Sequence, residues 1–446
     1  MNNPTPARSR DLTEQCTSAL DEESRKLRVQ YSDLWKQTLE KPVSVARVYT
    51  RAQKRENEGR MEKLLRDAER RQKSRNGIDQ SIGRLRDYIR DLVLETIDER
   101  KRGAIERVLT TFADAGDDFV RKCREFDTEL RFDGIFQALR NLWIINSMQE
   151  AFGLPPRTNP SALAYSLLYT YSDNFLDSES VSLASKLEFG HLFGQRLSGT
   201  NIPETSDLLV KISSLVALIE EEYPRTLFPD VFMSLLAIHR AQLASLKQRL
   251  DPQQQDHADV LSISVEKGGT SVVADAFVAK GCLTTAETSF AFGYGVFLQF
   301  VDDLQDVKED SERGSETLFT QALENNVLDG ITNRLIHYIH RIMVTERPLN
   351  GPRAEALTEL ILQGSVGLIL ESIALHPEYF SADYVRHAEL LSPLAFEAIR
   401  NMHSRRSSLE RDFQASACSH LPLNRFPIKE SLREKTLPPK FGVSST

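Results

Sequence analysis

The sequence has few cysteines, no long uncharged apolar run and hardly any strand-like alternation of apolar and polar residues. Its 446 residues include four cysteines, which are widely spaced and form neither a Cys-x-x-Cys pair nor a cluster with histidine. Scattered cysteines of this kind are typical of free thiols in a reducing compartment. The pattern therefore disfavours a disulfide-stabilised fold and a zinc-binding fold.

Two further absences bear on location and partners. The opening stretch MNNPTPARSRDLTEQ has no apolar core, so we expect no secretory signal. No segment reaches the roughly 18 uncharged apolar residues that a membrane-spanning helix requires. The net charge of −8 disfavours a polyanionic partner. We therefore expect a cytoplasmic protein that neither crosses a membrane nor binds nucleic acid.

Apolar residues recur at helical spacing along most of the chain, which predicts an all-α fold. Residues 1–104 are rich in charge and predict a mostly helical N-terminal extension. Residues 105–405 predict a single large bundle of eight to ten helices, and residues 406–446 predict a flexible tail.

Two of the most apolar predicted helices end in aspartates. The first follows Asn159, which has the character of a helix N-cap, and Pro160, which suits the first helical position. The second follows a break near Gly281 and ends in the stretch FLQFVDDLQDVKED. Both helices are apolar on nearly every side and should therefore be central in the bundle.

The aspartates at each end recur four residues apart, so helical geometry places them on one face. The first cluster is Asp173, Asn174 and Asp177, and the second is Asp302, Asp303 and Asp306. Like charges at this spacing are mildly destabilising, and the C-terminal end of a helix also disfavours anions. A bound cation would offset both effects.

Mg²⁺ is the metal that these oxygen ligands suit best, since it is typically held by one or two carboxylates together with water and phosphate oxygens. One such cluster alone is usually a solvated helix end. Two clusters at the ends of apolar helices favour a shared function, in which several Mg²⁺ ions surround one diphosphate and make it a better leaving group.

The stretch EKGGTSVVADAFVAKGCLTTAETSFAFGYGVFLQFVDDLQDV resembles the class I isoprenoid synthases. That superfamily contains trans-prenyl diphosphate synthases, squalene and phytoene synthases, and class I terpene synthases. In the prenyl synthases, a lysine and a small residue precede a helix, and a second helix leads to a FQxxDDxxD motif. Here LQFVDDLQD is similar to that motif, with Leu298 in place of phenylalanine, and Lys267 stands in the lysine region.

The resemblance implies roles for these residues. Lys267 and Gln299 would contact the diphosphate, and Asp302, Asp303 and Asp306 would hold Mg²⁺. It also implies a first aspartate motif on an opposing helix upstream.

The segment SDNFLD supplies such a first motif through Asp173, Asn174 and Asp177. Asp302 lies 129 residues after Asp173 (302 − 173), a separation that suits the helices the family places between its motifs. The resemblance covers roughly residues 136–375.

Three departures from the chain-elongating enzymes narrow the expected reaction. No arginine pair follows the first motif, where Arg196 stands alone, and no Gly-Gly-Lys-Arg type site occurs near the start. The lysine that should follow the second motif is also absent from its usual place. The sequence is closest to a terpene synthase that keeps aspartates at both sites, with Arg196 and Arg240 as further candidates for the diphosphate. His191 and His239 are expected to be bystanders.

We therefore expect an Mg²⁺-dependent class I terpene synthase that ionises a prenyl diphosphate, with aromatic side chains shielding the resulting allylic cation. The candidates for this shielding are Trp143, Tyr169, Phe175, Phe292 and Phe297. Two alternatives stay open: a transferase that condenses two prenyl diphosphates, and a non-enzymatic helical scaffold. Whether the chain forms a homodimer is also left open.

Overall fold

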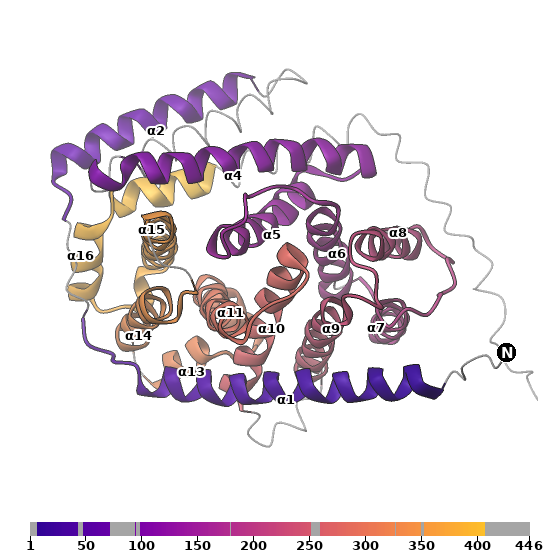
Figure 1. Cartoon of the computed structure of the whole chain (residues 1–446). Coiled ribbons are helices and arrows are strands. Elements are labelled where there is room, and N and C mark those ends of the chain that lie inside the picture. The colour runs from indigo at the N-terminus through magenta and orange to yellow at the C-terminus, as the bar shows by residue number, and fades with distance from the viewer. Residues whose placement is uncertain are drawn as a thin grey trace, which may run out of the picture. The chain divides into compact units, whose positions relative to one another are not determined.

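The structure is a computed structural model, and every regular element among its described residues is helical (Figure 1). It describes residues 7–42, 48–71, 94, 99–178, 180–250, 259–325, 327–348 and 352–405. The all-α prediction is confirmed for these residues. The chain divides into two compact units, Met1–Phe396 and Glu397–Thr446, and residues 397–405 of the second unit are helical. The tail predicted at 406–446 lies outside the described residues.

Two helices belong to the predicted extension, and a larger set follows it. The first two are α1 (Ala7–Gln37) and α2 (Arg51–Arg71). The long helices after them are α4 (Glu99–Phe126), α5 (Phe132–Ala151), α6 (Pro160–Asp177), α7 (Leu183–Leu197), α8 (Asp207–Glu222), α9 (Pro229–Leu250), α10 (Val260–Lys280), α11 (Thr285–Gln305), α14 (Asp329–Arg341) and α15 (Pro352–Leu375). The short ones are α12 (Val307–Arg313), α13 (Leu318–Asn325) and α16 (Ala382–Leu391).

The ten long helices match the expected eight to ten, whereas the three short helices exceed it among the described residues. Helices of 7–10 residues span too few turns to show a clear apolar period. A π-helical turn, Ile342–Glu346, continues α14, and a 3₁₀ turn, Pro377–Tyr379, follows α15.

The ends of the central helices follow from local chemistry. Asn159 and Pro160 start α6 as predicted, but the Asn159 amide donates to Glu222 instead of capping its own helix. Gly281 ends α10 with φ of +83°, a conformation that glycine adopts without strain. Thr284 and Glu287 then form a reciprocal capping box that starts α11.

Helices α10 and α11 form the centre of the first unit and approach each other very closely. A Cβ atom placed on Gly295 would lie 2.1 Å from the carbonyl oxygen of Gly268, and one placed on Gly269 would lie 2.4 Å from the ring of Phe292. Only glycine fits such a crossing. The two glycines that follow Lys267 therefore allow the start of α10 to lie against the end of α11.

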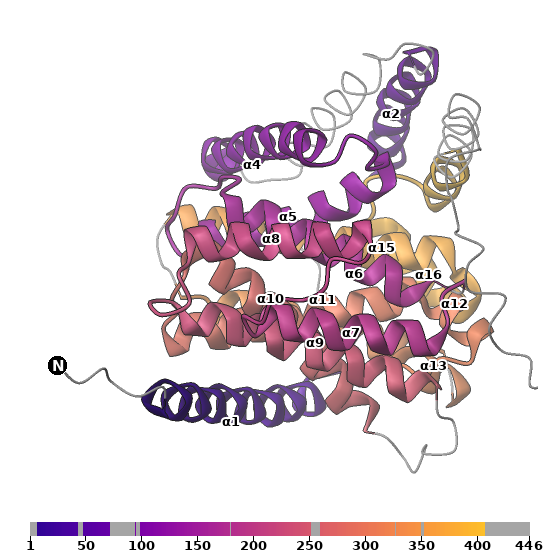
Figure 2. The ribbon, with the colours of Figure 1, turned by 90° about the vertical axis from the view of Figure 1, so that its right-hand side faces the viewer.

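The N-terminal helix α1 packs against α9, α10, α11 and α14. Figures 1 and 2 show α1 along one side of these helices and α4 along the opposite side. Tyr31 and Trp35 of α1 are buried, and the Tyr31 hydroxyl donates to the carbonyl oxygen of Ser289 at 2.6 Å. The described part of the predicted extension thus contributes aromatic side chains to the core.

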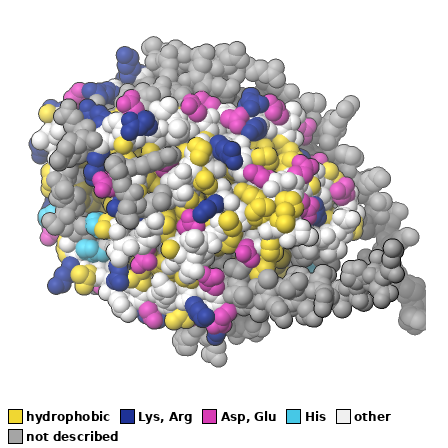
Figure 3. All heavy atoms as spheres, viewed as in Figure 1, with side chains coloured by type: hydrophobic (Ala, Val, Ile, Leu, Met, Phe, Trp, Pro, Cys, Tyr) yellow, Lys and Arg dark blue, Asp and Glu magenta, His cyan; other side chains and the backbone are white. Residues whose placement is uncertain are grey.

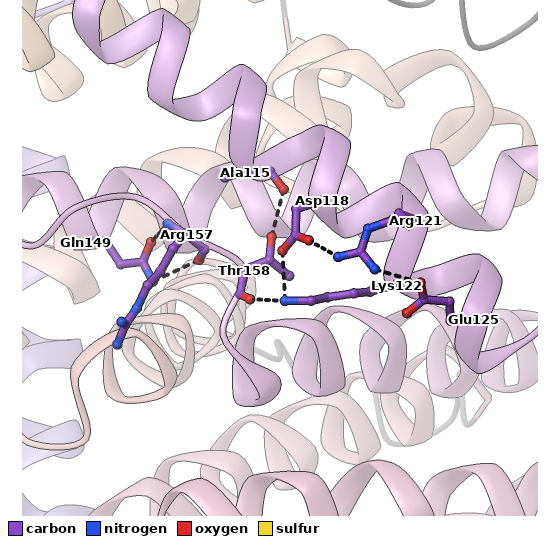
Figure 4. Close-up of polar contacts among 8 residues, drawn as sticks. All are labelled: Ala115, Asp118, Arg121, Lys122, Glu125, Gln149, Arg157 and Thr158. Carbon is purple, nitrogen blue, oxygen red and sulfur yellow. Dashed lines mark hydrogen bonds and ion pairs between the residues drawn. The ribbon is translucent and has the colours of Figure 1, made fainter.

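Polar contacts attach α4 to the loop between α5 and α6 (Figure 4). The Lys122 ammonium donates to the carbonyl oxygen of Thr158 at 2.7 Å, and the Thr158 hydroxyl donates to the carbonyl oxygen of Ala115 at 2.8 Å. The side chain of Gln149 bonds both the N–H and the carbonyl of Arg157. The end of this loop that leads into α6 is therefore attached to both α4 and α5.

One segment of the described chain, Ala354–Leu375 in α15, is long and apolar enough to cross a bilayer by length and composition alone. It packs against α4, α5, α11, α14 and α16, as a core helix of a bundle does. On the face seen in Figure 3, acidic and basic side chains are interspersed around a group of hydrophobic ones.

Candidate functional site

The two aspartate clusters lie at the C-terminal ends of α6 and α11. Asp177 is the last residue of α6, and Asp302 lies in the last turn of α11.

Charges from both clusters act on the phenol of Tyr169. Its pKa is raised well above the usual range, first by burial and then by the carboxylates of Asp173 and Asp302, with Asp177 adding to the effect. Asp173 and Asp302 come from different helices, yet both charges act on this one side chain. The fold therefore brings the first and second clusters to the same end of the bundle.

Asp303 is the buried member of the second cluster, with 7% of its surface exposed. It accepts a hydrogen bond from the amide of Gln299 at 2.8 Å and a longer one from Ser264 at 3.4 Å. Burial raises the pKa of Asp303 to about 7, against the opposing effects of Gln299 and Lys267. Lys267 and Gln299, paired in the sequence prediction as diphosphate contacts, thus lie beside the same carboxylate.

Asp306 stands at the junction of α11 and α12. Burial raises the pKa of Asp306 to about 6, helped by the neighbouring charges of Asp302, Asp310 and Glu309. Its backbone N–H donates to the carbonyl of Asp302, and its own carbonyl accepts from the N–H of Asp310. Because α12 begins at the next residue, Asp306 also lies at a helix start, where negative charge is favourable. The unfavourable position of this negative charge at the end of α11 is therefore partly offset by the start of α12.

Two residues of α5 join the site without having been singled out in the sequence. The amide of Gln137 donates to a carboxylate oxygen of Asp173 at 3.3 Å. Arg140 is exposed one helical turn further on, and its charge lowers the pKa of both Tyr169 and Asp306. Arg140 is thus a cation placed between the two clusters.

Two residues predicted for the site, Arg196 and Arg240, are not shown beside it. Arg196 is buried and makes a bidentate ion pair with Glu220, at 2.9 and 2.7 Å. It lies near the end of α7, roughly 20 Å along that helix from its start beside the first cluster. Arg240 is exposed near the middle of α9, and Asn174 is exposed beside Asp173.

Within the described ranges, no group of three or more His, Cys, Asp and Glu side chains lies close enough together to hold a metal ion. The two clusters together, Asp173, Asn174, Asp177, Asp302, Asp303 and Asp306, are called the carboxylate mouth below. Their donors are carboxylate and amide oxygens, which is the chemistry that Mg²⁺ accepts. After burial, the neighbouring charges of Asp302, Asp310 and Glu309 raise the pKa of Asp306, and a bound cation would oppose their effect. Metal binding here would need the two clusters to draw closer, with water and phosphate oxygens completing the coordination.

Two hollows adjoin the clusters. A small cavity of about 20 Å³ lies between α6, α7 and α9, and Tyr169 and Ser172 form part of its wall. An open depression of about 410 Å³ lies beside Asp306 and includes Lys308, Arg313 and His376.

A further carboxyl group, outside the two clusters, is fully buried in α10. Asp275 of α10 accepts a hydrogen bond from the amide of Asn141 at 3.0 Å, and its second oxygen has no partner among the described residues. Burial raises the pKa of Asp275 well above its usual range. The carboxyl group therefore keeps its proton in the folded protein at pH values where the unfolded chain has lost it.

We expect Asp275→Asn to raise the free energy of unfolding at pH 7, because burial holds the pKa of Asp275 well above its usual range in the folded protein. Since the folded state binds the extra proton, wild-type stability falls as pH rises above roughly 4, and asparagine removes this loss. The advantage should vanish below pH 4. Urea denaturation across pH measures it, with Glu204→Gln, an exposed charge removal, as the control. A constant difference between Asp275→Asn and wild type at all pH values would contradict the prediction.

Comparison of the chain with protein-family models, with curated proteins and with solved structures finds no match.

Proposed function

We propose that the protein is an Mg²⁺-dependent class I terpene synthase that ionises a prenyl diphosphate, after which the cation cyclises or loses a proton. One observation carries the proposal: Asp173 and Asp177 of α6 and Asp302 of α11 all act on the phenol of Tyr169. Carboxylates from two clusters distant in sequence thus act on one side chain, which supports the proposal because a diphosphate site of this kind would need both clusters close to it.

The chain offers anionic and cationic groups for such a substrate. Asp173, Asp177, Asp302 and Asp306 would hold Mg²⁺, with Asn174 and Asp303 beside them. Bound Mg²⁺ would neutralise the diphosphate and improve it as a leaving group.

Arg140 and Lys267 are two cations whose charges lower the pKa of a carboxyl group in the second cluster. They would attract the diphosphate and stabilise the charge that develops on it as it leaves. Gln299 holds Asp303 in a fixed orientation through its hydrogen bond.

The substrate's hydrocarbon chain sets a condition on the proposal. Ligand pockets have volumes on the order of 300–1,000 Å³, whereas the cavity beneath Tyr169 measures about 20 Å³. A volume of about 20 Å³ cannot hold a prenyl chain, so the proposal requires that the chain bind outside this cavity. Phe292 and Phe297 are fully buried and fill the core beside α10 and α1.

The test is incubation of the full chain with Mg²⁺ and one prenyl diphosphate at a time, namely geranyl, farnesyl or geranylgeranyl diphosphate. We expect release of diphosphate together with a hydrocarbon or alcohol from a single substrate. Product formed only when isopentenyl diphosphate or a second prenyl diphosphate is added would replace the synthase with a transferase. Absence of diphosphate release with every substrate would refute the proposal.

The small cavity favours a second candidate, a non-enzymatic helical scaffold. That candidate predicts no thermal shift with Mg²⁺ and inorganic diphosphate, since nothing would bind the folded state preferentially. The synthase predicts a rise in melting temperature that requires both additions together. Loss of this rise in Asp173→Asn would assign the binding to the carboxylate mouth.

A further inference from the structure

The small cavity between α6, α7 and α9 has room for about one water molecule, because a site of roughly 10–15 Å³ suffices for one. Its wall combines aromatic, aliphatic and polar side chains. The polar ones are Tyr165, Tyr169, Ser172, His239 and Gln242. A water molecule enclosed there would have hydrogen-bonding groups around it.

His239 has the unsatisfied group in this wall. The side chain is 4% exposed, and its Nε2 lies 2.8 Å from the carbonyl oxygen of Gly190. Because a carbonyl oxygen only accepts, Nε2 carries the proton and Nδ1 presents a lone pair. Nδ1 is buried and has no hydrogen-bond partner among the described residues.

The position of the imidazole ring is closely constrained. A Cβ atom on Gly194 would lie 3.2 Å from Nε2, and the ring of Phe193 meets the imidazole edge-on with centroids 4.9 Å apart. Burial lowers the pKa of His239, which keeps the imidazole neutral, against the raising effect of its bond to Gly190. The ring is therefore a fixed, uncharged proton acceptor.

The cavity also lies next to the first aspartate cluster. Tyr169 and Ser172 line it, and Asp173 is the residue that follows Ser172. Tyr169 is the side chain on which both carboxylate clusters act. The cavity thus adjoins the turn of α6 that carries Asp173.

We propose that this cavity binds one water molecule, that His239 Nδ1 accepts a hydrogen bond from it, and that this water captures the allylic cation. The inference rests on the proposed function and adds the product class, a prenyl alcohol. The carbon–oxygen bond to diphosphate breaks and both electrons leave with diphosphate. The water oxygen then forms a new carbon–oxygen bond, and one water proton passes to Nδ1. The imidazolium returns this proton to solvent.

The first experiment is turnover of a prenyl diphosphate by the wild-type protein in H₂¹⁸O. The inference expects a prenyl alcohol that carries ¹⁸O and a diphosphate that carries none. Hydrocarbon without alcohol would overturn the inference and leave the proposed synthase standing. ¹⁸O in the released diphosphate, or no diphosphate release at all, would overturn the proposed function and the inference with it.

The second experiment replaces the base. Gln in place of His239 keeps a donor toward Gly190 but removes the basic nitrogen, and His191→Gln is the matched change at an exposed histidine of α7. We expect His239→Gln to lower the alcohol fraction by about tenfold or more, since a positioned base typically contributes 10²–10⁴-fold. Diphosphate release should stay within about threefold of wild type. An unchanged alcohol fraction, or an equal fall in both quantities, would overturn the role of His239.

A measurement on the wild-type protein covers the case in which His239→Gln does not fold. The ¹⁵N spectrum of the histidine-labelled chain should contain one neutral imidazole that is protonated at Nε2, unprotonated at Nδ1 and absent from the spectrum of the variant His239→Phe. A ring protonated at Nδ1 would leave no lone pair for the water and would overturn the inference.

Discussion

Replacing Asp302 with asparagine is expected to lower the rate of diphosphate release by about 10²–10³-fold, the usual loss when one preorganised electrostatic contact to a developing charge is removed. Asparagine keeps the shape of the exposed side chain and removes its charge at the mouth. The stability of the protein should change little or rise slightly, because a like charge beside Asp306 is lost. Steady-state release of diphosphate and urea denaturation measure the two quantities separately.

The control for Asp302→Asn removes one carboxylate charge from the next helix, α12. Glu309 is exposed on α12 and pairs with Arg313 at 2.7 Å, so Glu309→Gln should change the rate less than about threefold. Equal losses in the two variants would mean that general charge, and not the cluster, sets the rate.

A double-mutant cycle tests whether the two clusters act together. Asp173→Asn should cost about as much as Asp302→Asn, and the double variant should cost little more than either one. Residues that serve one reacting group as a unit are strongly non-additive in this way. Fully additive losses would indicate two separate sites and would contradict the shared mouth inferred from Tyr169.

The helices that carry the clusters could be predicted from the sequence because their signals are local. The dipeptide Asn159–Pro160 marks the start of α6, and Gly281 marks the break between α10 and α11. The pairing of Asp173 with Asp302 has no local signal. The prediction that they form a pair rests on the resemblance. Among the described residues it is supported by the common effect of both charges on Tyr169.

The remaining site residues depend on tertiary packing. Arg140 is an exposed arginine of an amphipathic helix, and nothing in its local sequence marks it as a site residue. Its position near the clusters follows from the packing of α5 against α6. His239 is a lone histidine whose free nitrogen becomes evident only when Gly190 of another helix occupies the other nitrogen. Asp275 could have been noticed, since it is the one charged residue within SVVADAFVA, and burial of that apolar run is what raises its pKa.

Trp35→Ala is expected to reduce the free energy of unfolding by about 3–5 kcal/mol, the usual cost of removing a buried aromatic side chain. Trp35 is 2% exposed on α1, and its ring packs against Phe300 of α11 and Tyr338 of α14 with centroids 4.4 and 5.8 Å apart. The guanidinium of Arg334 lies 5.4 Å from the ring and adds a cation–π contact. Urea denaturation monitored by circular dichroism measures the loss.

The second tryptophan of the chain supplies the matched control. Trp143 of α5 is 41% exposed and meets Phe136 edge-on, so Trp143→Ala should cost at most about 1 kcal/mol. Phe300 lies two residues before Asp302, and loosening of α1 therefore reaches the helix end that carries the second cluster. If both variants lose the same stability, α1 is not part of the core. If Trp35→Ala alone is costly, an N-terminal truncation without α1 should lack both the stability and the carboxylate mouth.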